Sequence, residues 1–291
     1  MRKVFSRIRR KIHTRLNLPY KHQYGEFFIL LPADHLLPIY QRKHKLYDRF
    51  LPHIAKYLDP GSTIIDVGAN CGDTLAAMHQ ANKSLVYVCI EPDDFFFKFL
   101  QANARRIRGN SKGSSIKTIQ SLIGKSVKNA SLEGTGGTKK AIKGSSGATL
   151  LSSTLDAILS ANSIHSVKLL KSDVDGYDYD VIDSAEEIIA RDVPILFFEC
   201  QFDHSFQKAG YEATIYRLAL QGYDAWVIFD NFGEIILRTD STAQIFQLFN
   251  YVWHQNVGRS TRTIHYFDVL AFAPKDHELV GRVVADYVST C

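Results

Sequence analysis

The 291-residue sequence contains only four cysteines, two methionines and two tryptophans. The cysteines, Cys71, Cys89, Cys200 and Cys291, form no C-x-x-C pair, and the first three lie in or beside segments predicted to be core strands. This spacing favours small, reduced core residues over a disulfide framework or a zinc site.

The sequence also lacks a run of 18 apolar residues, so no transmembrane helix is expected. Its basic start leads into further charge rather than an apolar stretch with a small-residue cleavage site, which predicts no signal peptide and a cytoplasmic location. With 45% hydrophobic residues, the chain can bury one substantial core. We expect a basic extension and cap over residues 1–58 and one α/β domain over 59–291.

Two ligand-binding patterns are missing as well. None of the eleven histidines forms an H-x-x-x-H pair on a convincing helix, so no metal centre of that kind is expected. No G-x-G-x-x-G turn is present either. Because pyrophosphate binding needs that glycine spacing, a nicotinamide dinucleotide is a poor fit.

Positive charge is concentrated at the N-terminus, and the rest of the chain is nearly neutral. Eight cations precede the first acid, Glu26: Arg2, Lys3, Arg7, Arg9, Arg10, Lys11, Arg15 and Lys21. Apolar residues recur every four positions among them, at Val4, Ile8, Ile12 and Leu16. This pattern predicts an amphipathic helix within residues 2–21, which can bind the anionic inner face of a membrane or pack on the domain or a second subunit.

The segment IIDVGANCGDT, residues 64–74, is typical of a buried parallel strand that enters a glycine turn and then a helix. Gly68 and Gly72 give the backbone freedom and allow close approach of a ligand to its N–H groups. Glu91 follows Asp66 by 25 residues and ends the second apolar strand, where an acid can bind ribose hydroxyls. Together these features predict a nucleotide-like cofactor at the carboxyl ends of two strands.

Strands and helices alternate along most of the sequence, which predicts a parallel, doubly wound sheet. A glycine-rich excursion near residues 124–147 interrupts this alternation, and a short hairpin is one interpretation of it. Further strands are expected before Asp173 and Glu199, with a helix near 179–190 between them. A β-hairpin at 224–238 and a final antiparallel strand near 265–274 complete the sheet.

Three segments resemble the signatures of FkbM-type methyltransferases, which use S-adenosylmethionine: DVGANCGDT, the strand end IEP at 90–92, and KSDVDGYDYDVIDSA at 171–185. The resemblance extends from about Asp59 to Pro274. It departs from the family at Ser172, where Ile or Leu is more frequent, and at Asp175, where Glu is. The shorter Asp175 side chain has the same chemistry and less reach.

The resemblance implies a Rossmann-like class I methyltransferase fold, with a mostly parallel seven-stranded doubly wound sheet, one antiparallel strand and an N-terminal helical extension. It also implies a set of cofactor-binding residues in the first two signatures. These are Asp66, Gly68, Asn70, Gly72, Asp73, Thr74 and Glu91.

Acids in and after the third signature, and one histidine, are candidates for catalysis, because a carboxylate or a histidine can take the proton of an acceptor hydroxyl. The candidates are Asp173, Asp175, Glu199 and His204. Capping of the next helix is the alternative role for this acidic turn. Asp173 and Glu199 can also hold Mg²⁺ through their oxygens, and His35 is a further candidate base.

We therefore expect an O-methyltransferase that acts on a sugar hydroxyl of a glycan or glycolipid precursor, as in polysaccharide biosynthesis. A nucleic-acid methyltransferase is one alternative, for which only the basic N-terminus argues, since no DPPY or NPPY tetrapeptide occurs. A cofactor-binding assembly protein without catalysis is the other. A homo-oligomer is compatible with the sequence.

Overall fold

The computed structural model describes residues 16, 18–110, 114–126, 129–133, 140–143, 150–259, 261–262 and 264–290. Most of the basic segment 2–21 lies outside these residues, so its amphipathic helix and its membrane contact stay predictions. Among the helices that are described, none combines the length and the apolar character needed to cross a membrane.

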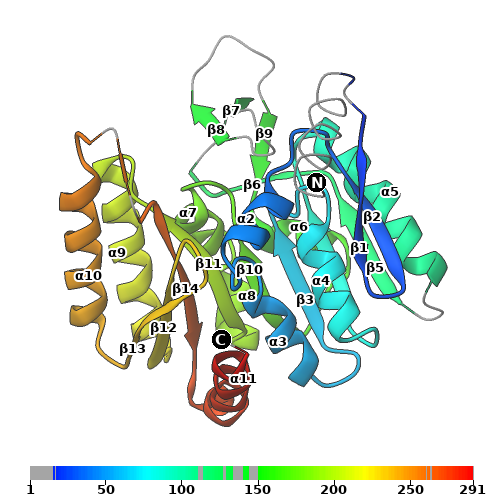
Figure 1. Ribbon diagram of the computed structural model, residues 1–291. Helices are drawn as coiled ribbons and strands as arrows, with labels where there is room; N and C mark the ends of the chain where they lie inside the picture. Colours follow the sequence, from blue (N-terminus) through cyan, green and yellow to red (C-terminus); the bar gives the residue numbers. More distant parts are fainter. Residues whose placement is uncertain are drawn as a thin grey trace.

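A mixed, mostly parallel sheet of eight strands forms the centre of the molecule (Figure 1). In spatial order its strands are β13 (Ile235–Thr239), β12 (Ala225–Asp230), β14 (Tyr266–Phe272), β11 (Ile195–Gln201), β10 (Val167–Ser172), β3 (Thr63–Val67), β4 (Val86–Ile90) and β5 (Ser115–Ile119). Strand β14 runs antiparallel to both β11 and β12, and β13 runs antiparallel to β12. The predicted Rossmann-like architecture and its antiparallel strand are confirmed.

The expected count of seven strands is wrong by one, because β13 adds an edge strand. It follows β12 through a tight turn in which the Asp230 carboxylate accepts hydrogen bonds from the N–H groups of Phe232 and Glu234. Gly233 adopts a positive φ of 90° in this turn. The turn therefore folds Ile235–Thr239 back onto β12, as the predicted hairpin requires.

Two hydrophobic clusters cover the two faces of the sheet, because successive side chains of a strand point to opposite faces. In β11, for example, Ile195 and Phe197 belong to one cluster, whereas Leu196 and Phe198 belong to the other. The first face packs against α3 (Phe50–Tyr57), α4 (Asp73–Ala81), α5 (Asp94–Asn110) and α11 (His277–Ser289). The second packs against α6 (Leu155–Ala161), α7 (Asp178–Asp183), α8 (Glu186–Asp192), α9 (Ser205–Leu220) and α10 (Thr242–Asn256).

The described part of the N-terminal extension contains a hairpin besides its helices. The hairpin is antiparallel and consists of β1 (Tyr20–Tyr24) and β2 (Phe27–Leu31), and it is followed by α2 (Leu37–Lys43) and α3. Alternating burial along β2 fits a strand rather than a helix. The side-chain amide of Asn103 on α5 bonds both the N–H and the carbonyl of Leu30, each at 2.8 Å. The hairpin therefore packs into the same core as the sheet, and the division of the chain at residue 58 stays a prediction.

The predicted helix near 179–190 consists of two helices, α7 and α8. The Asp156 carboxylate accepts hydrogen bonds from the N–H groups of Glu187 and Ile188 and so caps the start of α8. Helix α9 starts at Ser205 and ends at Leu220. In the excursion, β7 (Asn129–Glu133) and β8 (Lys140–Lys143) form a hairpin beside β9 (Leu150–Ser153) and the short β6 (Leu122–Ile123).

Candidate active site

Two neighbouring cavities open at the carboxyl ends of the parallel strands. The first has a volume of about 60 Å³ and includes Gly68, Asn70, Glu91 and Phe96 in its wall. The second has a volume of about 160 Å³ and is enclosed by β10, β11, β14 and the segment from Leu46 to Pro52. We call the first the donor cavity and the second the acceptor cavity.

The glycine turn after β3 is held by backbone hydrogen bonds. The N–H groups of Gly68 and Ala69 both donate to the carbonyl of Ile90, at 3.0 Å. Gly68 has a φ of 75°, and a Cβ at this position would lie 1.9 Å from the carbonyl oxygen of Asp173. Glycine is thus required because the turn touches the end of β10, whereas the sequence-based expectation placed the cofactor against this position.

Glu91 lies in the wall of the donor cavity and is 6% exposed. One carboxylate oxygen accepts the N–H of Asn70 at 2.8 Å, and the other accepts the N–H of Asp93 at 2.9 Å. Burial raises the pKa of Glu91 to about 7, although these two hydrogen bonds favour the ionised form. The side chain therefore fixes the glycine turn and retains lone pairs that can accept further hydroxyl groups.

A buried ion pair joins β3 to β10, and its Lys171 lines the acceptor cavity. The Lys171 ammonium lies 2.9 Å from the Asp66 carboxylate and 3.6 Å from that of Asp173. It also donates to the carbonyl of Gly68 at 3.1 Å. Burial disfavours the charged form of Lys171, but the carboxylates of Asp66 and Asp173 outweigh this effect and raise its pKa. Asp66, predicted to bind cofactor, is thus an internal partner of Lys171 and is not among the residues lining either cavity.

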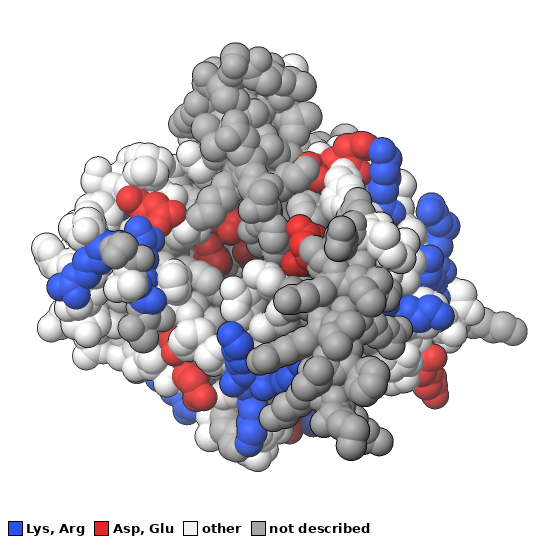
Figure 2. Space-filling view, turned by 45° about the horizontal axis from the view of Figure 1, so that its top comes forward, with Lys and Arg blue, Asp and Glu red and all other residues white. Residues whose placement is uncertain are grey.

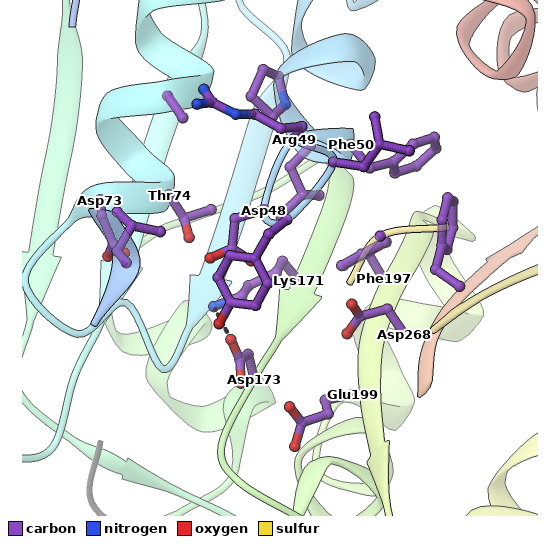
Figure 3. A pocket seen from close by; sticks show the side chains of 18 of the residues that line it. Asp48, Arg49, Phe50, Asp73, Thr74, Lys171, Asp173, Phe197, Glu199 and Asp268 are labelled. Carbon is purple, nitrogen blue, oxygen red and sulfur yellow. Dashed lines mark ion pairs between the residues drawn. The ribbon is translucent and has the colours of Figure 1, made fainter. Parts of the chain in front are cut away.

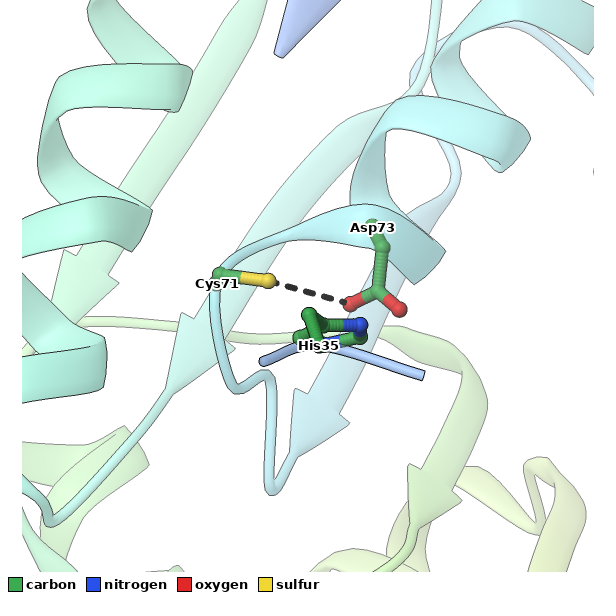
Figure 4. Close-up of side chains that lie close together, drawn as sticks. All are labelled: His35, Cys71 and Asp73. Carbon is green, nitrogen blue, oxygen red and sulfur yellow. Dashed lines mark hydrogen bonds between the residues drawn. The ribbon is translucent and has the colours of Figure 1, made fainter. Parts of the chain in front are cut away.

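Asp73 and Thr74, at the start of α4, line the acceptor cavity. Asp73 also lies close to His35 and Cys71, and ligand atoms of the three side chains lie within 4.8 Å of one another (Figure 4). The Cys71 thiol contacts the Asp73 carboxylate at 3.9 Å, and the Nδ1 atom of His35 accepts the N–H of Leu37 at 3.3 Å. Burial raises the pKa of the Cys71 thiol, so it remains protonated and serves as a donor to Asp73.

Asp173 and Asp175 each line both cavities. Asp173 follows β10 directly, and its side chain is 52% exposed. Its N–H donates to the carbonyl of Val67, which fixes its backbone beside the end of β3. Asp175 adopts a positive φ of 56° in the turn that follows. These two acids therefore mark the boundary between the donor and acceptor cavities.

Asp178 holds this turn together and is fully buried. One of its oxygens accepts the Ser172 hydroxyl at 2.6 Å and the N–H of Val174 at 3.1 Å. The other is 3.4 Å from both the N–H of Gly176 and the Tyr211 hydroxyl. The departure from the family pattern at Ser172 thus supplies a buried hydrogen bond to Asp178. Asp178 stabilises the turn before α7 and does not cap that helix, whose N-cap residue is Tyr177.

Carboxylates and aromatic rings form the acceptor cavity (Figure 3). Glu199 and Asp268 face each other across β11 and β14, and Asp48 lies on the opposite side near Arg49. Burial, reinforced by the nearby Asp173, raises the pKa values of both Glu199 and Asp268 well above their ordinary range. The aromatic part of the wall comprises Tyr47, Phe50, Phe197, Phe229, Tyr266 and Tyr287.

The two candidate histidines are not among the residues that line these cavities. His204 is exposed and precedes α9 as its N-cap residue, in a capping box with Gln207. Its ring stacks on that of Phe206 with a centroid distance of 5.3 Å. His35 contacts the glycine turn from the N-terminal segment. Any action of either residue as a base would require the site to rearrange.

Several lining residues were not named as site residues from the sequence. Lys171 and Asp268 each interrupt an apolar strand, and a polar residue at such a position is a signal that could have been used. Tyr47, Asp48 and Arg49 lie in a segment between α2 and α3 without a motif. Only the packing of this segment over β10 and β11 reveals that it lines the cavity.

The sequence model of the methyltransferase FkbM domain matches residues 66–238. The chain belongs to the FkbM methyltransferase family. No curated protein is similar enough to count as a match. This FkbM-family chain is, however, similar to several solved structures.

One of these is an FkbM methyltransferase from Methylobacillus flagellatus, with 14% identity and a TM-score of 0.40 over 72% of this chain and 43% of that one. The chain thus spans less than half of that protein. A putative transferase from Pyrococcus horikoshii has 13% identity and a TM-score of 0.46, with coverages of 88% and 73%. Fibrillarin from Aeropyrum pernix, solved with S-adenosyl-L-methionine, has 12% identity and a TM-score of 0.40, with coverages of 75% and 72%.

Proposed function

We propose that this FkbM-family methyltransferase uses S-adenosylmethionine to methylate a sugar hydroxyl of a glycan or glycolipid precursor. The observation that carries the proposal is the position of Asp173 and Asp175 in the walls of both cavities. A methyl group that passes between two ligands must cross such a boundary. We also propose membrane association through residues 2–21 and assembly into a homo-oligomer, and both proposals rest on the sequence alone.

The residues of the donor cavity fit S-adenosylmethionine. Glu91 can accept ribose hydroxyls with the lone pairs that its two backbone hydrogen bonds leave. Phe96, Leu122 and Ile123 form an apolar wall suited to an adenine ring. When bound, the cofactor supplies a methyl group already activated by its positively charged sulfur.

Asp173 is the proposed general base. Its carboxylate accepts the proton of the acceptor hydroxyl while the new oxygen–carbon bond forms and the sulfur–carbon bond breaks. Lys171 lies 3.6 Å away and holds this carboxylate at the boundary. Most of the remaining catalytic effect is expected to come from alignment of the acceptor behind the methyl group.

The acceptor cavity favours a hydroxylated ligand without negative charge. Carboxylates accept hydrogen bonds from hydroxyl groups, and the aromatic rings offer apolar faces to a sugar ring. Figure 2 shows acidic side chains around a recess near the middle of this face. Such a recess repels phosphates, which argues against nucleic acid as the acceptor.

The sequence also predicted Mg²⁺ at Asp173 and Glu199. Both residues line the acceptor cavity, and carboxylate oxygens are suitable ligands for this ion. We keep magnesium as a variant of the proposal, in which the ion acidifies the hydroxyl. Activity after treatment with a chelator, with and without added Mg²⁺, tests this variant.

The experiment that tests the function measures methyl transfer from labelled S-adenosylmethionine to a panel of sugars and glycolipids. Calorimetry with the cofactor alone is run in parallel. Cofactor binding with methylation of a sugar hydroxyl supports the proposal. Binding with no turnover on any acceptor class supports the non-catalytic alternative, whereas methylation of RNA or DNA in place of sugars overturns the proposed substrate.

A further inference from the structure

Glu199 and Asp268 form an unusual pair in the acceptor cavity. In the antiparallel register of β11 and β14 they lie directly opposite each other. Like charges at directly opposed positions of a sheet destabilise it. Both side chains face the cavity (Figure 3). The pair therefore needs either protons or a cation between the two carboxylates.

The side chain of Glu199 points to a missing ligand. The residue is 6% exposed, and its Oε1 atom has no hydrogen-bond partner within the described residues. A buried polar atom without a partner costs about 1 to 3 kcal/mol and is unusual in a folded protein. Because Glu199 lines the acceptor cavity, a ligand bound there can supply the absent donor.

The charged residues around the acceptor cavity indicate the sign of the charge that this ligand carries. Six acids and two cations are present among the described residues that line the cavity: Asp48, Asp73, Asp173, Asp175, Glu199 and Asp268 against Arg49 and Lys171. Lys171 is already engaged by Asp66 at 2.9 Å. The cavity thus has an excess of negative charge, to which β11 and β14 contribute Glu199 and Asp268.

We propose that Glu199 and Asp268 bind a protonated amino group of the acceptor, which makes the substrate class an amino sugar or a glycan that contains one. This inference rests on the proposed function, because it concerns the acceptor of the same reaction. With the amino group held at β11 and β14, a hydroxyl elsewhere on the ring can reach Asp173 at the donor cavity. Glu199 and Asp268 are therefore binding residues, distinct from the base.

Aromatic rings favour an ammonium group over a metal ion as the occupant. Phe50 contacts Phe197 and Phe229, with centroid distances of 5.8 Å and 4.5 Å, and these three rings line the cavity next to the acids. Aromatic faces attract alkylammonium groups and pack against the carbons that carry them. Mg²⁺ instead retains several waters and requires octahedral oxygen ligands, which an apolar wall does not provide.

The test compares matched probes by calorimetry: glucosamine, N-acetylglucosamine and glucose, with MgCl₂ as a fourth. Glucosamine is expected to bind at least about tenfold more tightly than its two neutral counterparts, the usual effect of a hydrogen-bonded charge. Glu199→Gln and Asp268→Asn should each remove this preference. Asp240→Asn, at an exposed carboxylate between β13 and α10, is the matched control and should preserve it.

Burial raises the pKa values of Glu199 and Asp268, so binding of an ammonium group should displace protons from these carboxyl groups. Titrations in two buffers of different ionisation enthalpy detect this release. Equal affinity for the three sugars, or a preference that survives both substitutions, overturns the proposal. Tight binding of MgCl₂ that is lost in both variants overturns it in favour of a metal. Binding of S-adenosylmethionine is measured separately with the same proteins. Failure of the cofactor to bind therefore counts against the proposed function, whereas failure of the amine to bind counts against this inference.

Discussion

The donor and acceptor cavities are adjacent but are built in different ways. On the donor side, each Glu91 oxygen accepts a backbone N–H from a residue two or twenty-one positions away. On the acceptor side, the Glu199 Oε1 atom has no partner within the described residues, and Asp268 lies opposite it with the same charge. On the donor side, both oxygens of Glu91 therefore have hydrogen-bond partners within the protein. On the acceptor side, the Glu199 Oε1 atom requires a ligand that supplies a hydrogen-bond donor.

In the proposed function, this difference separates binding of the cofactor from binding of the acceptor. A family of methyltransferases can keep one donor and change its acceptors, since a fold hosts many substrates through its surrounding segments. In this chain the donor side combines the loops after β3 and β4 with Phe96, Leu122 and Ile123 and with the turn after β10. The acceptor side combines the N-terminal segment around Asp48 with β10, β11 and β14. Substitutions that distinguish the two sides should therefore affect different steps.

The largest effect is expected at Lys171, which supports both sides at once. Lys171→Met leaves the Asp66 carboxylate buried and unpaired, which should lower the free energy of unfolding by about 3 to 5 kcal/mol. Urea denaturation measures the change. The double variant Asp66→Leu, Lys171→Met removes both charges and should recover much of the stability. A double variant no more stable than the single one would contradict this account.

Gly68→Ala should disrupt the donor side, because the new Cβ would lie 1.9 Å from the Asp173 carbonyl oxygen. We expect cofactor binding to be lost, as measured by calorimetry. Gly61→Ala is the matched control: its φ of 83° is similar, but no heavy atom lies within 4 Å of the added Cβ. If both variants lose cofactor equally, backbone strain rather than contact with β10 explains the glycine.

Asp173→Asn tests the boundary between the two sides. The amide keeps the shape but cannot accept the acceptor proton, so turnover should fall by about a hundredfold or more while cofactor affinity remains. Steady-state kinetics and calorimetry measure the two quantities. Near-normal turnover in this variant, together with a large loss in Glu199→Gln, would move the base to the acceptor side.

The smallest effect is expected for substitution of Glu91, whose ionisation makes the free energy of unfolding depend on pH. Its pKa is about 7 in the folded protein and 4.5 for an unperturbed glutamate. Between pH 4.5 and pH 7, Glu91 is ionised in the unfolded chain but protonated in the folded chain. The free energy of unfolding therefore falls as pH rises through this range. From pH 5 to pH 7 the free energy of unfolding should drop by about 2 kcal/mol on this account.

Glu91→Gln should remove that pH-dependent part and weaken cofactor binding about tenfold or more. Denaturation at a series of pH values and calorimetry measure the two effects. Glu278→Gln, at an exposed position of α11, provides the control. An unchanged pH profile in Glu91→Gln would assign the titration to other buried acids, among which Asp178 also has a pKa raised to about 7 by burial.

The sequence by itself determined the alternating strands and helices, the glycine turn at Gly68 and the acids at the strand ends. These features follow from local rules, because buried strands are continuous apolar runs and a turn with positive φ favours glycine. The same local reasoning predicted the β12–β13 hairpin but did not identify the β1–β2 hairpin. Short apolar runs are compatible with more than one structure until their partners are known.

Only the tertiary structure decided which side chains form the acceptor cavity. Asp48 and Asp268 are 220 positions apart in the sequence, and no local pattern connects them, yet both line one cavity. Register placed Asp268 opposite Glu199, and packing closed the Asp48 segment over the sheet. On the donor side, the glycine turn and Glu91 could be recognised in the sequence because each directly follows a continuous apolar strand. The acceptor side could not, because its charges meet only when distant strands pair.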